Sequence, residues 1–169
     1  VNYLVVQGAM RLKIPFGIAQ IGKAFRNEII ARNFIFRTRE FEQMEMQYFV
    51  KPETDNDAMN EWKENRFQFY TNHLGLTKSK LRFHKHGDGE LAHYAKEAWD
   101  IEYEFPFGWS EIEGVHNRTD YDLLRHEEFS GKKLSYFDQV NNKRYLPYII
   151  ETSAGLNRML LTVLADSYW

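Results

Sequence analysis

Arginines crowd the segment from residue 25 to residue 49, FRNEIIARNFIFRTREFEQMEMQYF, where four of them fall within fourteen positions. Arg37 and Arg39 are predicted on one face of a strand, because residues i and i+2 of a strand project the same way. A planar guanidinium binds phosphate oxygens bidentately, so arginines converging from a loop and an adjoining strand suit a phosphate ligand. The alternative is a solvated face on which the arginines pair with neighbouring glutamates. The arginines are Arg26, Arg32, Arg37 and Arg39, and the glutamates are Glu28, Glu40 and Glu42.

A second group of candidate residues lies in IIETSAGLNRMLL, residues 149–161. Glu151 ends a predicted strand, Ser153 is predicted to cap the helix that follows, and Arg158 falls in the first turn of that helix. A helix N-terminus offers free backbone N–H groups and a partial positive charge, so this one, with its arginine, suits an anion. The alternative is a plain strand-to-helix cap with an exposed arginine.

Carboxylates accompany both segments. Glu45 and Glu151 are predicted on strand faces, where they either balance the arginines or receive a cationic ligand. A metal site in the HKH segment at residues 84–86 is a weaker hypothesis, because no carboxylate is spaced to support it. No P-loop, dinucleotide fingerprint, nucleophile elbow or zinc-protease motif occurs, so phosphate binding would use none of these. A third charged segment, EIEGVHNRTDYDL, carries Glu111, Glu113, Arg118 and Asp120.

The composition indicates one globular domain spanning residues 1–169, with 43% hydrophobic and 16% aromatic residues to fill a single core. The net charge of −2 argues against a general polyanion-binding surface, so any contact with nucleic acid would have to be local. The absence of cysteine excludes disulfides and thiolate metal sites and is compatible with a reducing compartment. No apolar run approaches a membrane span and no signal peptide is visible. Because the sequence starts at Val1 within a structured pattern, we expect it to begin inside a longer protein.

Hydrophobic periodicity predicts an α+β fold, an antiparallel β-sheet flanked by helices, because many strands follow one another with few helices between them. In the strand predicted at 41–50, Met44, Met46 and Tyr48 alternate with Gln43, Glu45 and Gln47, which gives one apolar face and one polar face. Residues 1–13 are predicted to be the end of a helix, and further helices are predicted at 55–74, with Thr54 and Asp55 at its cap, at 121–128, and after Ser153. The predicted strands are 18–25, 34–39, 41–50, 99–105 and 111–116, with a hairpin of 134–139 and 144–152 and loops at 26–33 and 76–90.

Taken together, these motifs resemble those of a known family. FRNEI followed by RNFIFRTREFEQMEMQYFV is similar to motif 2 of class II aminoacyl-tRNA synthetases, and YIIETSAGLNRMLL is similar to motif 3, whose arginine falls at Arg158. GIAQIGKAFRNEI, LAHYAK and EIEGVHNRTDYDL narrow the resemblance to glycyl-tRNA synthetases of the homodimeric type. The similarity runs essentially from end to end.

The resemblance implies a class II catalytic core that activates glycine with ATP to glycyl-adenylate and passes the glycyl group to tRNA(Gly). It further implies Mg²⁺ with the ATP, a homodimer, a cytoplasmic location and no membrane partner. In this family motif 1, an ETAQG segment and an anticodon-binding domain lie outside the part seen here. A chain limited to these 169 residues is therefore expected to bind ATP only weakly, to lack glycyl transfer, and to be marginally stable and prone to self-association.

The resemblance also assigns site residues. Arg26, Glu28 and Arg158 would be catalytic, with Phe41 stacking on adenine, Arg37 or Arg39 near the phosphates, and Glu111 at the metal. The implied ATP contacts are Arg26, Asn27, Glu28, Phe36, Arg37, Thr38, Arg39, Glu40, Phe41, Glu111, Ile112, Gly155, Leu156, Asn157 and Arg158. The implied glycine contacts are Phe41, Glu42, Gln43, Met44, Glu45, Glu151, Thr152, Ser153, Ala154 and Gly155.

Two other functions fit part of the pattern. One is a catalytically silent synthetase-like paralogue that binds or regulates, which the presence of Arg26, Glu28, Glu45, Glu151 and Arg158 disfavours. The other is a prolyl, threonyl or histidyl enzyme of the same class, which the glutamates and small residues of EFEQMEMQYF and ETSAG disfavour.

Overall fold

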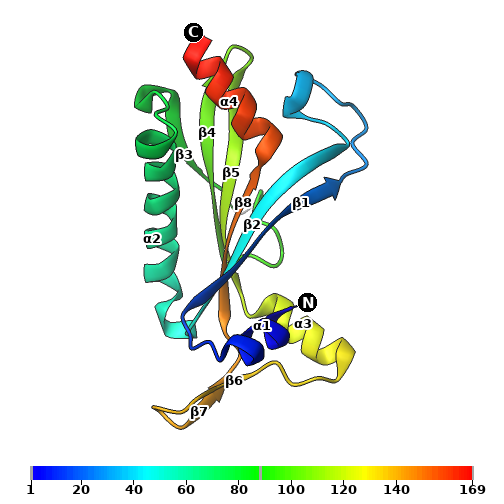
Figure 1. Cartoon of the computed structure of the whole chain (residues 1–169), viewed down its shortest axis with the longest axis vertical. Helices are drawn as coiled ribbons and strands as arrows, with labels where there is room; N and C mark the ends of the chain where they lie inside the picture. The colour runs from blue at the N-terminus through cyan, green and yellow to red at the C-terminus, as the bar shows by residue number, and fades with distance from the viewer. Residues whose placement is uncertain (1, 88, 169) are drawn as a thin grey trace.

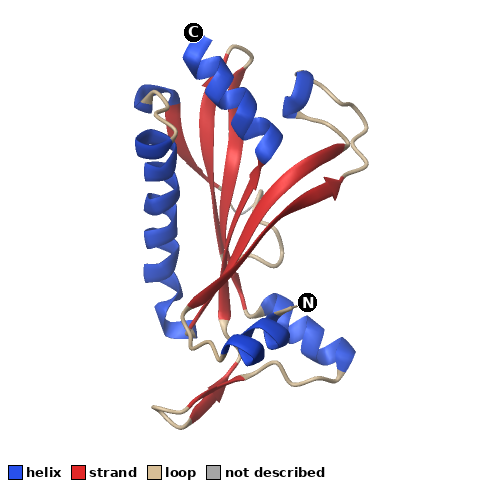
Figure 2. Ribbon diagram, viewed as in Figure 1, coloured by secondary structure: helices blue, strands red, loops and turns tan. Residues whose placement is uncertain are grey.

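The computed structural model describes residues 2–87 and 89–168, and its centre is a six-stranded antiparallel sheet. The strand order is β1-β2-β8-β5-β4-β3, so strands far apart in the chain lie side by side (Figure 1). Helices flank this sheet (Figure 2), which confirms the predicted α+β fold. The strands of the sheet are β1 (Phe16–Phe25), β2 (Glu40–Val50), β3 (Leu81–Lys85), β4 (Glu97–Phe105), β5 (Gly108–Thr119) and β8 (Tyr148–Gly155).

The predicted helices are all present. Among the described residues, no helix combines the length and the apolar character needed to cross a bilayer. One end of the sheet carries α1, α3 and a small β6-β7 hairpin, whereas α4 lies toward the other end (Figure 1). Their bounds are α1 (Tyr3–Met10), α2 (Asp55–Gln68, continued by a π-helical turn at Phe69–His73), α3 (Tyr121–Ser130), α4 (Leu156–Tyr168), β6 (Tyr136–Asp138) and β7 (Lys143–Tyr145).

One face of the sheet carries the two clusters of buried side chains against which α4 and α2 pack. Met59 of α2 lies against Val115 and Ile150, and Met159 of α4 lies against Ile101 and other buried residues. The alternation predicted for β2 puts Met44, Tyr48 and Val50 on this face and Gln43, Glu45 and Gln47 on the other, where Phe49 joins a smaller apolar cluster with α1 and α3. The polar face thereby receives Gln43, Glu45 and Gln47 from β2 beside Glu151 and Ser153 from β8.

The predicted strand at 34–39 is wrong. The chain forms a 3-10 turn at Phe34–Phe36, and both Asn33 before the turn (φ 57°) and its first residue Phe34 (φ 55°) lie in the left-handed region. Backbone hydrogen bonds in both directions join Arg32 and Arg37, at 3.1 and 3.2 Å, so the segment closes on itself as a loop. The apolar run was misleading because Phe36 is buried against Phe105 and Phe107 rather than in a sheet.

The predicted loop at 76–90 contains a strand, β3, which pairs with β4 at the edge of the sheet. Leu81 is buried, and Phe83 packs against the core, but the basic residues between and after them hid this short alternation. An edge strand needs a partner on one side only and tolerates charges on its exposed side, so its sequence signal is weak.

The predicted hairpin is only partly correct. Tyr136 pairs with Tyr145 in the small hairpin, but Tyr148–Gly155 leaves it to become β8, between β2 and β5 in the main sheet. Ser153 therefore lies inside a strand and does not cap α4, which begins at Leu156. The change of sheet follows from burial, because Ile150 is fully buried between α2 and the central strands.

Candidate active site

Two adjoining cavities open on the polar face of the sheet, and both are lined by Arg26, Gln43, Glu111 and Ser153. The first cavity extends toward the loop between β1 and β2 and the start of α4, where further lining residues include Arg37, Phe41 and Arg158. The second cavity, of about 580 Å³, extends along the strands toward α3. The two segments predicted to bind an anion thus meet at one place.

Arg158 is held rigidly at the wall of the first cavity. Its Nε donates to the carbonyl oxygen of Phe36 at 3.0 Å, and its Cζ lies 4.3 Å from the centre of the Phe36 ring. Its Nη1 donates to the backbone oxygen of Glu111 at 3.0 Å and to the carboxylate of that residue at 3.3 Å. Across the cavity, Arg26 stacks over Phe41 with its Cζ 5.2 Å from the ring centre. Two guanidinium groups and an aromatic ring therefore border one space.

The structure distinguishes Arg37 from Arg39. Arg37 lines the first cavity, 4.0 Å from the Glu28 carboxylate, and its buried Nε has no hydrogen-bond partner among the described residues. Arg39 instead donates from Nε to the backbone oxygen of Glu28 at 2.9 Å, which fixes the loop. An arginine with an unsatisfied donor is the better candidate for an anionic ligand, because burying that donor unpaired is costly.

Several residues assigned by the resemblance lie away from the shared space. Ile112, Thr152 and Ala154 are buried in the sheet, and Met44 packs against its core face. A separate cavity beside α4 is lined by Glu40, Glu42, Leu156 and Asn157; Glu40 pairs with Lys23, and the Glu42 backbone N–H donates to Asn157 Oδ1 at 2.9 Å. Phe41 and Asn157 reach both this cavity and the first one. Asn27 lies in the exposed turn after β1. Glu28, Phe36, Thr38 and Gly155 line the first cavity.

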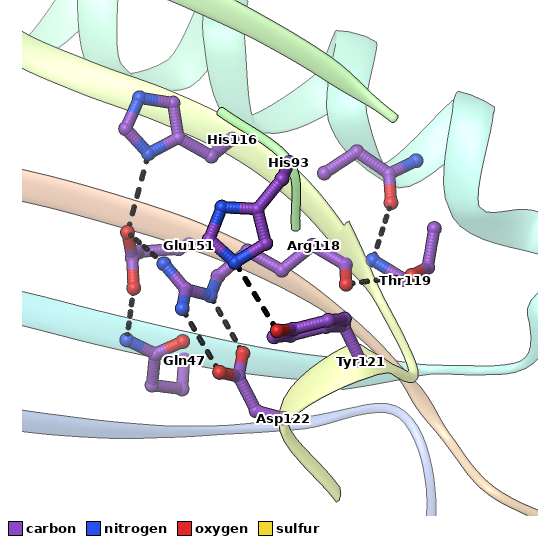
Figure 3. Close-up of polar contacts among 9 residues, drawn as sticks. Gln47, His93, His116, Arg118, Thr119, Tyr121, Asp122 and Glu151 are labelled. Atoms are coloured by element: carbon purple, nitrogen blue, oxygen red, sulfur yellow. Dashed lines mark hydrogen bonds and ion pairs between the residues drawn. The ribbon is translucent and has the colours of Figure 1, made fainter. Parts of the chain in front are cut away.

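Glu151 is the most enclosed acid in the second cavity, with a relative exposure of 7%. Oε1 accepts hydrogen bonds from His116 Nδ1 and Arg118 Nη1, each at 3.2 Å, and Oε2 accepts one from Gln47 Nε2 at 2.6 Å (Figure 3). Burial alone would raise the pKa of this carboxyl, but the hydrogen bonds from His116 and Gln47 and the charge of Arg118 outweigh it and lower the pKa. Glu151 is therefore a stable anion.

Glu45, on the neighbouring strand, has few partners. Its only hydrogen bond among the described residues is a long one, 3.5 Å, from the hydroxyl of Ser153, which itself accepts from Gln43 Nε2 at 2.7 Å. Partial burial, followed by the nearby charge of Glu151, raises the pKa of Glu45. A carboxylate with free oxygens beside a cavity and a second anion suits a cationic ligand.

Sequence reasoning named Arg118 as a charged residue but missed two other groups that fix Glu151, namely His116 and the Asp122 that holds Arg118. Arg118 is fixed by Asp122, with Nε to Oδ2 at 2.6 Å and Nη2 to Oδ1 at 2.9 Å, and its guanidinium lies 4.1 Å from the Tyr94 ring centre. The alternation of residues 114, 116 and 118 along β5 was a signal that would have put these side chains on the polar face. Glu113 faces the other way, buried at 1% exposure and paired with Arg66 at 2.6 Å.

The charge arrangement at Glu111 fits a magnesium ion carried by a phosphate ligand. Mg²⁺ commonly takes one or two protein carboxylates and completes its shell with phosphate oxygens and water. Glu111 is half exposed, with a side-chain exposure of 49%, and borders both cavities. In the described part of the chain, no group of three or more acidic, histidine or cysteine side chains is arranged to hold a metal without a ligand, at the 84–86 segment or elsewhere.

Comparison with known proteins assigns this sheet and its two adjoining cavities to a protein family. Residues 4–167 match the tRNA synthetase class II core domain (G, H, P, S and T), and the chain belongs to this family. Among its curated relatives are proteins named glycine–tRNA ligase. Those of Treponema denticola, Chlorobaculum tepidum and Thermobifida fusca are 62%, 58% and 54% identical over 169, 168 and 171 residues. Each alignment covers 99% of this chain, which spans 37%, 35% and 37% of the respective relatives.

Proposed function

We propose that this chain carries the amino-acid activation site of a glycine–tRNA ligase, with ATP in the first cavity and glycine where the two cavities join. The observation that carries the proposal is the convergence of Arg26, Arg37 and Arg158 around one cavity that continues directly to Glu45 and its neighbouring acid. The names of the three relatives support glycine as the substrate. The protein would transfer the glycyl group to tRNA(Gly) in the cytoplasm as a homodimer.

Activation is an in-line displacement at phosphorus. A carboxylate oxygen of glycine forms a bond to the α-phosphorus of ATP while the bond from that phosphorus to the bridging oxygen breaks, and pyrophosphate leaves. Arg26 stabilises the charge that develops at the α-phosphate, whereas Arg37 and Arg158 bind the leaving phosphates. The attacking carboxylate is already ionised, so this step needs no general base. Mg²⁺ held at Glu111 would supply further positive charge to the phosphate oxygens.

Binding of each substrate uses different residues. The adenine ring stacks on Phe41, opposite the guanidinium that already lies against that ring. Glu45 accepts hydrogen bonds from the glycine ammonium, which keeps this cation away from the reacting phosphate. Larger amino acids are excluded by size, and a side chain forced into a filled wall costs roughly 1–3 kcal/mol or more.

The deciding experiment is ATP–pyrophosphate exchange with the full-length gene product, run separately with each of the twenty amino acids. We expect exchange with glycine alone and at least a hundredfold loss in Arg26→Ala, because an unbalanced developing charge costs about 3 kcal/mol. Arg125→Ala is the matched control, since Arg125 is exposed on α3 and paired with Glu128 at 2.8 Å. Exchange with another amino acid would assign a different specificity, and none at all would favour a silent binding or regulatory paralogue.

A further inference from the structure

Glu45 and Glu151, two of the acids that line the second cavity, differ in how their oxygens are used. Both oxygens of Glu151 are taken, because three donors from two strands, Gln47 of β2 and His116 and Arg118 of β5, point at one carboxylate (Figure 3). Glu45 lies nearby on β2, whose partners in β8 are Ser153 for Glu45 and Glu151 for Gln47. Of this pair, only Glu45 can turn its oxygens to a new cation without breaking a strong contact.

His116 can hold Glu151 because its strand neighbour on the same face has no side chain. A Cβ built on Gly114 would lie 2.9 Å from Nε2 of the His116 ring, closer than a real Cβ approaches, and 3.0 Å from Cε1, so the ring would have to move. Gly114 has no positive φ, so its role is one of space and not of backbone conformation. The empty position lets the imidazole lie along the sheet with Nδ1 directed at Glu151.

The identity of the nitrogen that donates follows from the charges. Glu151 is ionised and can only accept, so Nδ1 of His116 carries the hydrogen. Without this donor, Oε1 would keep Arg118 alone, and the carboxylate would lose one of the three bonds that set its position. Arg118 donates hydrogen bonds to both Glu151 and Asp122, so a shift of Glu151 would also move the guanidinium.

We propose that His116 is a positioning residue for the amino acid: by fixing Glu151 through Nδ1, it leaves Glu45 as the acid that receives the substrate ammonium, and Gly114 supplies the space for its ring. This inference rests on the proposed function, because the cation that Glu45 receives is taken to be glycine. His116 itself does not touch the reacting atoms. Its effect is on glycine binding, while the phosphate-binding arginines lie outside its contacts.

The test is a set of variants in the full-length gene product, assayed by glycine-dependent ATP–pyrophosphate exchange. His116→Ala should raise the KM for glycine about tenfold, as expected for one lost hydrogen bond to a charged group, and leave the KM for ATP unchanged. His116→Asn should restore most of the glycine affinity, because the asparagine amide can donate from nearly the position of Nδ1. Gly114→Ala should resemble His116→Ala, since the new methyl group displaces the ring. His84→Ala is the control, because His84 lies on β3 and pairs with Glu90.

Equal KM values for glycine in the alanine, asparagine and wild-type proteins would overturn the inference. Parallel rises in the KM for glycine and ATP, with a lower melting temperature, would mean that His116 only stabilises the sheet. The ring is also tested without activity, since ¹⁵N NMR of the wild type should show hydrogen on Nδ1, and finding it on Nε2 alone would refute the contact. If the wild type fails to exchange with glycine while the NMR result holds, then the proposed function is what fails, and the role at glycine falls with it.

Discussion

Replacing Glu45 by glutamine is expected to weaken the binding of glycine and to leave the binding of ATP unchanged. The side chain keeps its size, but it loses the charge that would attract an ammonium group, and its only hydrogen bond among the described residues is the long one from Ser153. A hydrogen bond to a charged group contributes roughly 1.5–3 kcal/mol, so we expect the KM for glycine to rise about 10- to 150-fold. The phosphate site is not touched, and the KM for ATP should change by less than about twofold.

The stability of Glu45→Gln should change in the opposite direction from its activity. The folded-state pKa of Glu45 is raised, first by burial and then by Glu151, so the carboxyl contributes stability only when protonated and loses this contribution as pH rises through the raised pKa. At neutral pH a glutamine removes an unfavourable charge, and the free energy of unfolding should stay the same or increase.

The assay is ATP–pyrophosphate exchange with varied glycine at saturating ATP and the reverse, with urea unfolding of each protein. Glu104→Gln on β4 is the matched control, because Glu104 is exposed and lies outside both cavities. The raised pKa of Glu45 also predicts the pH at which acidification weakens glycine binding. In the wild-type enzyme this pH should be higher than it would be for a glutamate with an ordinary pKa. Equal losses of affinity for the two substrates, or a clear loss of stability, would refute the assignment of Glu45.

Three further predictions concern charged groups. The pKa of Glu151 is lowered by its hydrogen bonds despite burial, so the ionised carboxylate stabilises the fold at neutral pH and this contribution is lost as pH falls through the lowered pKa. In urea unfolding from pH 7 to pH 3, the free energy of unfolding should therefore fall less in Glu151→Gln than in the wild type. Asp55→Ala should lower the free energy of unfolding by about 3 kcal/mol, because buried Asp55 accepts from Asn117 at 2.6 Å and Lys96 at 2.7 Å; the KM for ATP should not change. Arg158→Lys should raise the KM for ATP at least tenfold in the exchange assay, because an ammonium cannot reproduce its forked contacts with two backbone oxygens.

The sequence by itself determined the class of the fold and most of its elements. Alternation in β2 depends only on the two-residue period of a strand, so the core side of Met44 and the polar side of Glu45 followed directly. The clustering of arginines likewise indicated a phosphate ligand, and Arg26 and Arg158 do line one cavity. These features are visible within short segments of the sequence, and they do not depend on which strands become neighbours.

Only the tertiary structure decided which side chains meet. β8 pairs with β2 and β5 in the main sheet and not within the predicted hairpin. Glu151 therefore lies beside Gln47 on one side and His116 on the other, and each of these pairs joins residues more than thirty positions apart. Arg37 and Arg39 carry the same group two residues apart, yet a closed loop directs one to the cavity and the other to the backbone. Strand order and loop closure are set by the burial of apolar faces from the whole chain, and no local pattern contains that information.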